Sequence, residues 1–401
     1  MSSLSVANLG RAPHRLMFFI GALNLLLAMA WWALWLAAAR WPFLSMPQPD
    51  PYAGRLHAFL MQYQVLPSFF FGFLLTVFPR WIGEPDLDRR KALPVGSGLL
   101  GGQILTLAGA LGWHPGVIAG AVVTLAGWSA GLVPLARLAW LAWHDRGRTW
   151  HAAGCFGALC LGAAGLALWL AFVLSGDAAL GDAAIELGTF GLLFPVYFTV
   201  AHRMIPFFAA SALPGYEPWR PKWLLAAGWT LMALHMVLPQ TLVWLADALL
   251  ALLTLAMLVR WYPRRRMPPL LFVLFAGLAW LPIAFLLYTV QGLMFTFAGQ
   301  FMLGRAPAHA LFIGFFGSIL VAMVTRVTQG HSGRPLIMPP VAVYAFVAVQ
   351  IVCITRIGGE LAMDWLAWQT AAAAGWLLAF LPWVIWAGRI YLLPRADDKP
   401  G

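Results

Sequence analysis

The stretch HALFIGFFGSILVAMVTRVTQGHSGRP, from His309 to Pro335, decides how this chain can fold. It opens on a histidine, continues as a long apolar run and closes in a basic, glycine-broken turn that carries His331. A helix of about 20 apolar residues crosses the roughly 30 Å hydrocarbon core of a bilayer. Because a polar group at membrane depth is costly, it is a functional-site candidate by default. The stretch therefore predicts a membrane helix that helps to carry a metal or haem site.

The composition of the whole chain is that of a membrane protein. Of its 401 residues, 62% are apolar and only 10% are charged, far less charge than a soluble protein of this size carries. A net charge of +11 would suggest nucleic acid as the partner of a soluble protein. Here the basic residues fall in short loops between apolar runs, so we expect a lipid bilayer as the partner and no nucleic acid.

The apolar runs predict an all-α, polytopic membrane protein with about twelve transmembrane helices. Because the loops are too short to fold alone, we expect one helical-bundle domain over residues 1–401. The expected spans lie near 16–39, 57–79, 92–112, 116–141, 151–174, 184–207, 223–239, 241–261, 268–290, 307–326, 338–356 and 364–393.

The basic residues alternate along the loops. If the N-terminus is cytoplasmic, only Arg40, Arg55, Arg305 and Arg356 fall on the outer side. Cytoplasmic loops are enriched in Lys and Arg, so this pattern places both termini inside. We therefore expect a multi-pass protein of a bacterial inner (cytoplasmic) membrane.

Four histidines lie at the ends of predicted spans. His57 and His309 open spans at the outer side, whereas His202 and His331 lie at the inner side. Imidazole is a common metal ligand, and two imidazoles from separate helices suit a bis-histidine haem or part of a copper site. The alternative is that all four histidines are interfacial caps.

The second span supports a site. His57, Met61, Gln64 and Ser68 recur at i, i+4, i+7 and i+11, which is one face of an α-helix. Such a face should point into the bundle, where His57 and Met61 could ligate haem or copper. Alternatively, Met61 fills a gap in the core and Gln64 bonds a neighbouring helix.

Basic residues recur at the inner side, within the segments TVFPRW, HRMIPFF and TRVTQGHSGRP. Their arginines Arg80, Arg203, Arg326 and Arg334 could pair with haem propionates, or they could anchor helix ends by the positive-inside rule. Asp247 is the one acid expected at depth, and His235 is interpreted as interfacial. Phosphate-binding and nucleophile-elbow motifs are absent from the sequence.

Several of these segments resemble the signature of the NnrS family. They are GHSGRP at 330–335, MVTRVTQ at 323–329, GFLLTVFPRWIG at 72–83 and HRMIPFF at 202–208. The resemblance implies a haem- and copper-containing membrane protein of about twelve helices that is associated with denitrification and protects cells from nitric oxide (nitrosative) stress. It assigns no defined enzymatic activity.

One departure from the family bears on copper. The second span of the family commonly opens with His-x-His-Glu, whereas this chain has His57-Ala58-Phe59-Leu60. The second histidine and the glutamate are missing, so the resemblance supports copper less than haem. His57, His309 and His331 match family histidines and are the candidate metal ligands.

The sequence thus predicts an inner-membrane haem b protein whose small ligand is nitric oxide or a relative. His57 and His309 are expected to hold the haem near the outer face, with Met61 and Gln64 lining the pocket. His202 and His331, with Arg203, Arg326 and Arg334, are expected to form an inner-side site. A secondary transporter of a metal, haem or small anion is the alternative. A catalytic nitric oxide reductase is disfavoured, because no dense histidine cluster is present.

Overall fold

The computed structural model describes residues 4–43, 45–144 and 150–397, and within them it is all helical, without strands. The α-helices are α1 (Pro13–Arg40), α2 (Ala53–Phe59), α3 (Leu66–Ile82), α4 (Ala92–Ala110), α5 (Pro115–His144), α6 (Trp150–Ser175), α7 (Ala178–Glu186), α8 (Phe194–Ala212), α9 (Lys222–Val237), α10 (Val243–Trp261), α11 (Pro269–Leu278), α12 (Trp280–Ala298), α13 (Ala306–His309), α14 (Ser318–His331), α15 (Pro340–Gly358) and α16 (Trp365–Leu392). The all-α fold class is confirmed.

Six shorter elements complete the described chain. Three are 3-10 turns: η1 (Val6–Arg11), η3 (Arg89–Lys91) and η6 (Gly359–Leu361). The other three are π-helices: η2 (Leu60–Val65), η4 (Leu187–Leu193) and η5 (Ala310–Gly317). Each π-helix joins two α-helices without a break, so it lies inside one long span.

Eleven helices in the described residues are long and apolar enough to cross a membrane. Each overlaps one of eleven predicted spans, and their ends differ by eight residues at most. The remaining predicted span, near 223–239, forms α9, which has 16 residues. At about 1.5 Å per residue this helix is about 24 Å long, shorter than a typical bilayer core.

The exposed side chains of the spans are apolar. Leu174, Leu252 and Ile351 each lie on a different span and are between 61% and 64% exposed. A soluble protein rarely exposes large apolar side chains in such numbers. The surface between the helix ends is therefore suited to lipid, as a multi-pass membrane protein requires.

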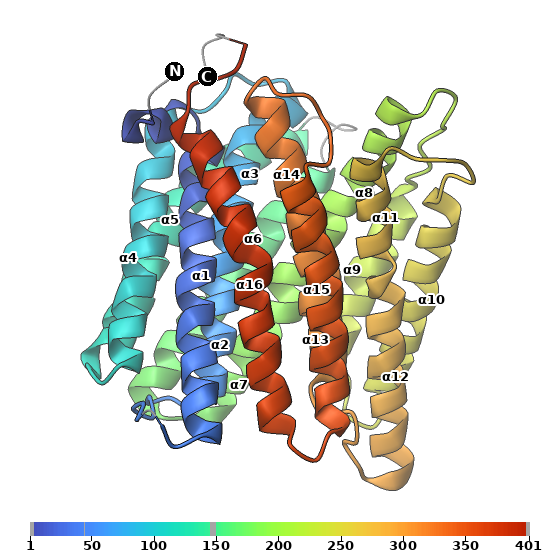
Figure 1. Ribbon diagram of the computed structural model, residues 1–401. Coiled ribbons are helices and arrows are strands. Elements are labelled where there is room, and N and C mark those ends of the chain that lie inside the picture. The colour runs from blue at the N-terminus through green and yellow to red at the C-terminus, as the bar shows by residue number, and fades with distance from the viewer. Residues whose placement is uncertain (1–3, 44, 145–149, 398–401) are drawn as a thin grey trace. The chain divides into compact units, whose positions relative to one another are not determined.

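The chain divides into two compact units, which are described separately. The first comprises residues 1–196 and 384–401, and the second comprises residues 197–383. In the first unit the two terminal segments meet: the backbone N–H of Ser5 and the side-chain amide of Asn8 both donate to the carbonyl of Leu392. Figure 1 shows the beginning of α1 and the end of α16 on the same side of this unit. The expectation of one domain stays a prediction.

Close packing of α4 against α5 holds the first unit together, and Figure 1 shows the two helices side by side. Gly98 and Gly127 face each other, and a Cβ on either one would overlap the Cα of the other. One step along the helices, Gly102 faces Thr124 and Gly120 faces Thr106 in the same way. Without a hydrophobic driving force in lipid, such small-residue contacts allow the dispersion attraction that pairs membrane helices.

Candidate functional site

Three spans are more buried than the other eight. They are Ala53–Ile82, Ala178–Ala212 and Ala306–His331, each 72% buried over its most apolar window, whereas the others range from 33% to 61%. The same three spans carry the histidines His57, His202 and His309, and each contains one π-helix. π-helical turns are uncommon in proteins, and where they occur they are often at functional sites. Each of these spans is therefore a candidate to carry functional residues.

The π-helix of the second span is held by side chains of neighbouring helices. Backbone bonding from i to i+5 displaces carbonyls from the regular i to i+4 pattern. The carbonyl of Tyr63 accepts the indole N–H of Trp128 at 3.0 Å. The carbonyl of Gln64 accepts the hydroxyl of Ser68 at 2.7 Å and the amide of Asn24 at 3.4 Å. These donors satisfy backbone groups that lipid cannot satisfy.

A buried amide cluster surrounds this π-helix in the first unit. The Nε2 of Gln64 donates to the hydroxyls of Thr106 and Thr124, at 3.1 and 2.8 Å. Each threonine hydroxyl donates in turn to a carbonyl four residues back. The amide of Gln103 donates to the carbonyl of Asn24 at 2.6 Å. Gln64 therefore hydrogen-bonds to neighbouring helices. This was one of the two interpretations of Gln64 that the sequence allowed.

The predicted polar face of the second span is interrupted by the π-helix. His57 and Met61 are half-buried, whereas Gln64 and Ser68 are fully buried. A π-turn takes more residues than an α-turn, so side chains after it rotate away from the positions that 3.6-residue spacing predicts. The i, i+4, i+7, i+11 pattern is therefore not one uniform face, and the pocket roles of Met61 and Gln64 stay predictions.

His57 is held by aromatic stacking. Its imidazole lies parallel to the indole of Trp32, with 4.5 Å between ring centroids and an interplanar angle of 7°. Trp32 is itself stacked on Trp35 at 5.5 Å and 2°. The three rings come from α1 and α2 of the first unit. Stacking fixes the plane of the imidazole ring, which is a requirement for a directional ligand.

His309 is oriented by its own helix. Its Nδ1 donates to the carbonyl of Arg305 at 2.9 Å. A carbonyl only accepts, so Nδ1 carries a proton, and in the neutral imidazole Nε2 then carries the lone pair. Metal-ligating histidines usually show this arrangement, in which one ring nitrogen donates to a carbonyl or carboxylate. His57 belongs to the first unit and His309 to the second, so their pairing stays a prediction.

The π-helix that follows His309 has its own support in the second unit. The hydroxyl of Tyr197 donates to the carbonyl of Phe316 at 3.3 Å, and the two rings stack at 4.3 Å. The amide of Gln350 donates to Ser318, the first residue after the π-helix, at 2.7 Å. Thus polar contacts from other helices support the π-helix in this span too.

His202 is tied to a loop. Its Nε2 donates to the carbonyl of Pro221 at 3.2 Å, and its ring meets Trp261 edge to face at 6.0 Å. The imidazole is 1% exposed. In the same loop Arg220 donates to the carbonyl of Arg203 at 3.4 Å. These contacts connect His202 of α8 to the loop that precedes α9. Ligation of a metal or haem iron by His202 stays a prediction.

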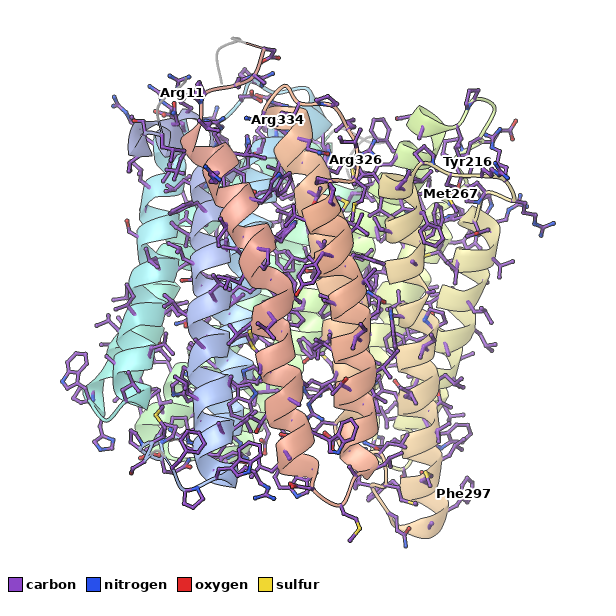
Figure 2. All side chains as sticks on the ribbon, viewed as in Figure 1. Arg11, Tyr216, Met267, Phe297, Arg326 and Arg334 are labelled. Carbon is purple, nitrogen blue, oxygen red and sulfur yellow. The ribbon has the colours of Figure 1, made fainter. Side chains whose placement is uncertain are left out.

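The arginines of the last motif are partly buried at one end of the second unit, where Figure 2 labels Arg326 and Arg334. Arg326 lies over the ring of Phe208, with its guanidinium carbon 4.0 Å from the ring centroid. Beyond His331 the chain turns at Gly333, whose φ of +70° is in the left-handed region, and the N–H of Arg334 returns to the carbonyl of Gln329 at 3.0 Å.

Arg334 has a side-chain nitrogen that the protein leaves unsatisfied. Its Nη1 is buried and has no acceptor among the described residues. Burial lowers the pKa of this guanidinium, because it penalises the charged form. Gln329 is 4% exposed, and its Oε1 also has no donor among the described residues. A ligand with an anionic group would satisfy Arg334 best.

The model of the NnrS protein family matches residues 8–395, nearly the whole chain. The chain belongs to the NnrS family. A comparison with curated proteins gives no match. The family resemblance expected from the motifs is thereby confirmed, and the motifs of this NnrS protein are the ends of its most buried spans.

Sequence reasoning missed one polar pair of this NnrS protein. In the second unit His235 of α9 and Asp247 of α10 bond through Nδ1 and Oδ1 at 2.6 Å, with side chains only 8% and 1% exposed. The interpretation of His235 as merely interfacial was therefore wrong. The available signal was Asp247 itself, because a buried acid in a membrane helix needs a partner.

The described part of this NnrS protein does not gather a multi-ligand metal site. No group of three or more His, Cys, Asp or Glu side chains within it is arranged to hold a metal ion. A copper site built from these four residue types alone would need such a group, whereas the thioether of Met is a further copper ligand. A haem iron needs only one or two protein ligands, because the macrocycle supplies the rest.

Proposed function

We propose that this NnrS-family protein binds haem b within the membrane and that the haem interacts with nitric oxide or a related small molecule, in a response to nitrosative stress. The single observation that supports the proposal best is the hydrogen bond from Nδ1 of His309 to the carbonyl of Arg305. It leaves Nε2 as the basic nitrogen, which is the form that binds iron.

His57 is the second candidate axial ligand. Its stacking on Trp32 restricts rotation of the imidazole ring. The stacked contact is between ring faces, so it does not involve a hydrogen bond from a ring nitrogen. His57 and His309 each lie at the start of a span that continues into a π-helix. Haem b supplies an iron that binds diatomic ligands, and the axial ligands and the polarity of the surroundings tune it.

The second unit also offers groups for an anionic ligand at the inner side. Nη1 of Arg334 lacks an acceptor within the described chain, and a carboxylate would supply one, with the strength of a charge-assisted hydrogen bond. Arg326 is held over Phe208. Arg334 and His309 lie at opposite ends of the span Ala306–His331, so we assign Arg334 to a separate inner-side site, where it contacts an anionic group and Arg326 adds a supporting positive charge. The inner-side roles of His202, His331 and Arg203 are kept as part of this proposal.

Copper stays a prediction from the family resemblance. Its candidate ligands are His57, His309 and His331, and the His-x-His-Glu pattern that would strengthen the case is incomplete in this chain. The proposal therefore rests on haem alone.

The experiment is an optical spectrum of the detergent-purified protein, oxidised and reduced, with haem and metal analysis on the same sample. We expect a Soret band that shifts on reduction and shifts again with nitric oxide. His309→Ala should lower the haem content or change the spin state. His144→Ala is the matched control, since Nδ1 of His144 bonds the carbonyl of Trp140, also four residues back, at 2.8 Å.

A colourless preparation that stays colourless after haem is supplied would overturn the proposal in favour of a transporter. Equal haem loss in His309→Ala and His144→Ala would remove His309 as a specific ligand.

A further inference from the structure

A basic cavity lies at the beginning of the chain in the first unit. Its volume is about 320 Å³, within the range of about 300–1,000 Å³ that is typical of small-molecule pockets. The turns η1 and η3 and the first residues of α1 and α4 line it. The lining residues that matter here are Leu9, Arg11, Leu16, Arg89, Arg90 and Leu93.

The cavity is strongly positive. None of the ion pairs between described residues involves Arg11, Arg89 or Arg90. The nearest acid in sequence, Asp88, uses its carboxylate to accept the backbone N–H of Arg90 at 2.9 Å. Among the described residues that line the cavity there is no acid.

The beginning of α1 adds to this positive potential. α1 starts at the cavity, and its N-cap residue Ala12 provides no side-chain hydrogen bond, whereas α4 continues from η3, whose first turn is capped by the carboxylate of Asp88. The first N–H groups of a helix carry the positive end of its dipole. Three arginines and the uncapped beginning of α1 therefore border one small space.

The cavity is also amphipathic. Arg11 lies two residues before the span that begins at Pro13, and Arg89 and Arg90 begin the span that ends at Ala110. Leu16 lies about one turn inside α1, and Leu93, the second residue of α4, is 51% exposed. We therefore expect the arginines at the depth of the phospholipid headgroups and the leucines on the side of the hydrocarbon.

We propose that this cavity binds the headgroup of an anionic phospholipid. The phosphate lies among Arg11, Arg89 and Arg90, and an acyl chain follows Leu16 and Leu93. Charge complementarity selects an anion, and the position at the start of two membrane spans selects a lipid over a soluble anion. This site is independent of the proposed haem function.

The test is native mass spectrometry of the purified protein titrated with dioleoyl phosphatidylglycerol in mixed micelles. Phosphatidylcholine and inorganic phosphate at equal ionic strength are the comparison ligands. We expect phosphatidylglycerol to bind more tightly than phosphatidylcholine, and phosphate not to displace it. Each arginine near an anionic headgroup contributes about a five-fold gain in affinity, so Arg89→Gln with Arg90→Gln should weaken binding by about 30-fold.

The matched control removes the same charge elsewhere. Arg264 and Arg266 are exposed and make no ion pair within the described residues, so Arg264→Gln with Arg266→Gln should leave the affinity unchanged. Arg11→Gln should weaken binding about five-fold and Arg11→Lys less, which tests the site even if the double variant unfolds.

Three outcomes would overturn the proposal: equal affinity for phosphatidylglycerol and phosphatidylcholine, equal loss in the two double variants, or displacement of the lipid by inorganic phosphate. The last would identify a site for a free anion.

Discussion

The guanidinium carbon of Arg326 lies 4.0 Å from the centroid of the Phe208 ring. Arg326 belongs to the segment that ends α14, and Phe208 to the HRMIPFF segment of α8. The two residues are 118 positions apart in the chain. Their two motifs therefore meet in one cation–π contact. Such a contact gains strength where water is excluded, and both side chains are at least half-buried.

The first prediction concerns this contact. A double-mutant cycle on Arg326→Met and Phe208→Leu should give a coupling energy of about 0.5–2 kcal/mol in thermal unfolding. Phe207 is the neighbouring ring and is 51% exposed, so a cycle on Arg326→Met and Phe207→Leu should be additive. Additivity in both cycles would show that the ring of Phe208 only packs.

The second prediction concerns the π-helix of the second span. Trp128→Phe removes the N–H that bonds the carbonyl of Tyr63 and leaves that carbonyl unsatisfied at membrane depth. We expect a loss of stability of about 1–3 kcal/mol, to which the lost ring volume adds. Trp140→Phe on the same helix is the control, because Trp140 is 64% exposed. Equal unfolding midpoints for the two variants would contradict a role of Trp128 in holding the π-helix.

The third prediction concerns the pair His235–Asp247. Removing one partner leaves a buried polar group alone, so Asp247→Leu or His235→Phe should each lower stability by about 3–5 kcal/mol. The double variant should be closer to the wild-type protein than either single variant, since no unpaired group remains. Tyr288 meets the imidazole edge to face at 5.6 Å, and a phenyl ring can keep this packing. A double variant as unstable as the sum of the singles would contradict the argument.

The helical spans could be predicted from the sequence because hydropathy depends only on composition within a window. The segments that identify the family could be recognised too, since TRVTQGHSGRP and HRMIPFF are not explained by burial in lipid, but their role in a site stays a prediction. The π-helices could not, because donors from other helices, such as Trp128 and Tyr197, stabilise the displaced carbonyls. The pair His235–Asp247 was missed because the two residues lie on different helices with a turn between them. The spacing of residues along one helix therefore cannot show that they are neighbours.

The last prediction concerns pH. Tyr216 lies in the loop between α8 and α9, and its hydroxyl donates to the carbonyl of Trp261 at 2.8 Å. Burial raises the pKa of Tyr216 to about 12, although the nearby charge of Arg260 acts in the opposite direction. In the unfolded chain a tyrosine loses its proton at about pH 10. The folded protein therefore retains a proton that the unfolded chain loses, and the stability from Tyr216 falls between about pH 10 and 12.

Tyr216→Phe separates this effect from all other titrations. Below about pH 10 the wild-type protein should unfold at a higher temperature than the variant by a constant margin, because the hydrogen bond to Trp261 is intact. From about pH 10 to about pH 12 that margin should shrink, as the wild-type protein loses the contribution of the protonated hydroxyl. Thermal unfolding midpoints of the two proteins, measured in parallel from pH 8 upward, check this. A margin that grows with pH would mean that the folded state favours the phenolate, the opposite of what burial of Tyr216 requires.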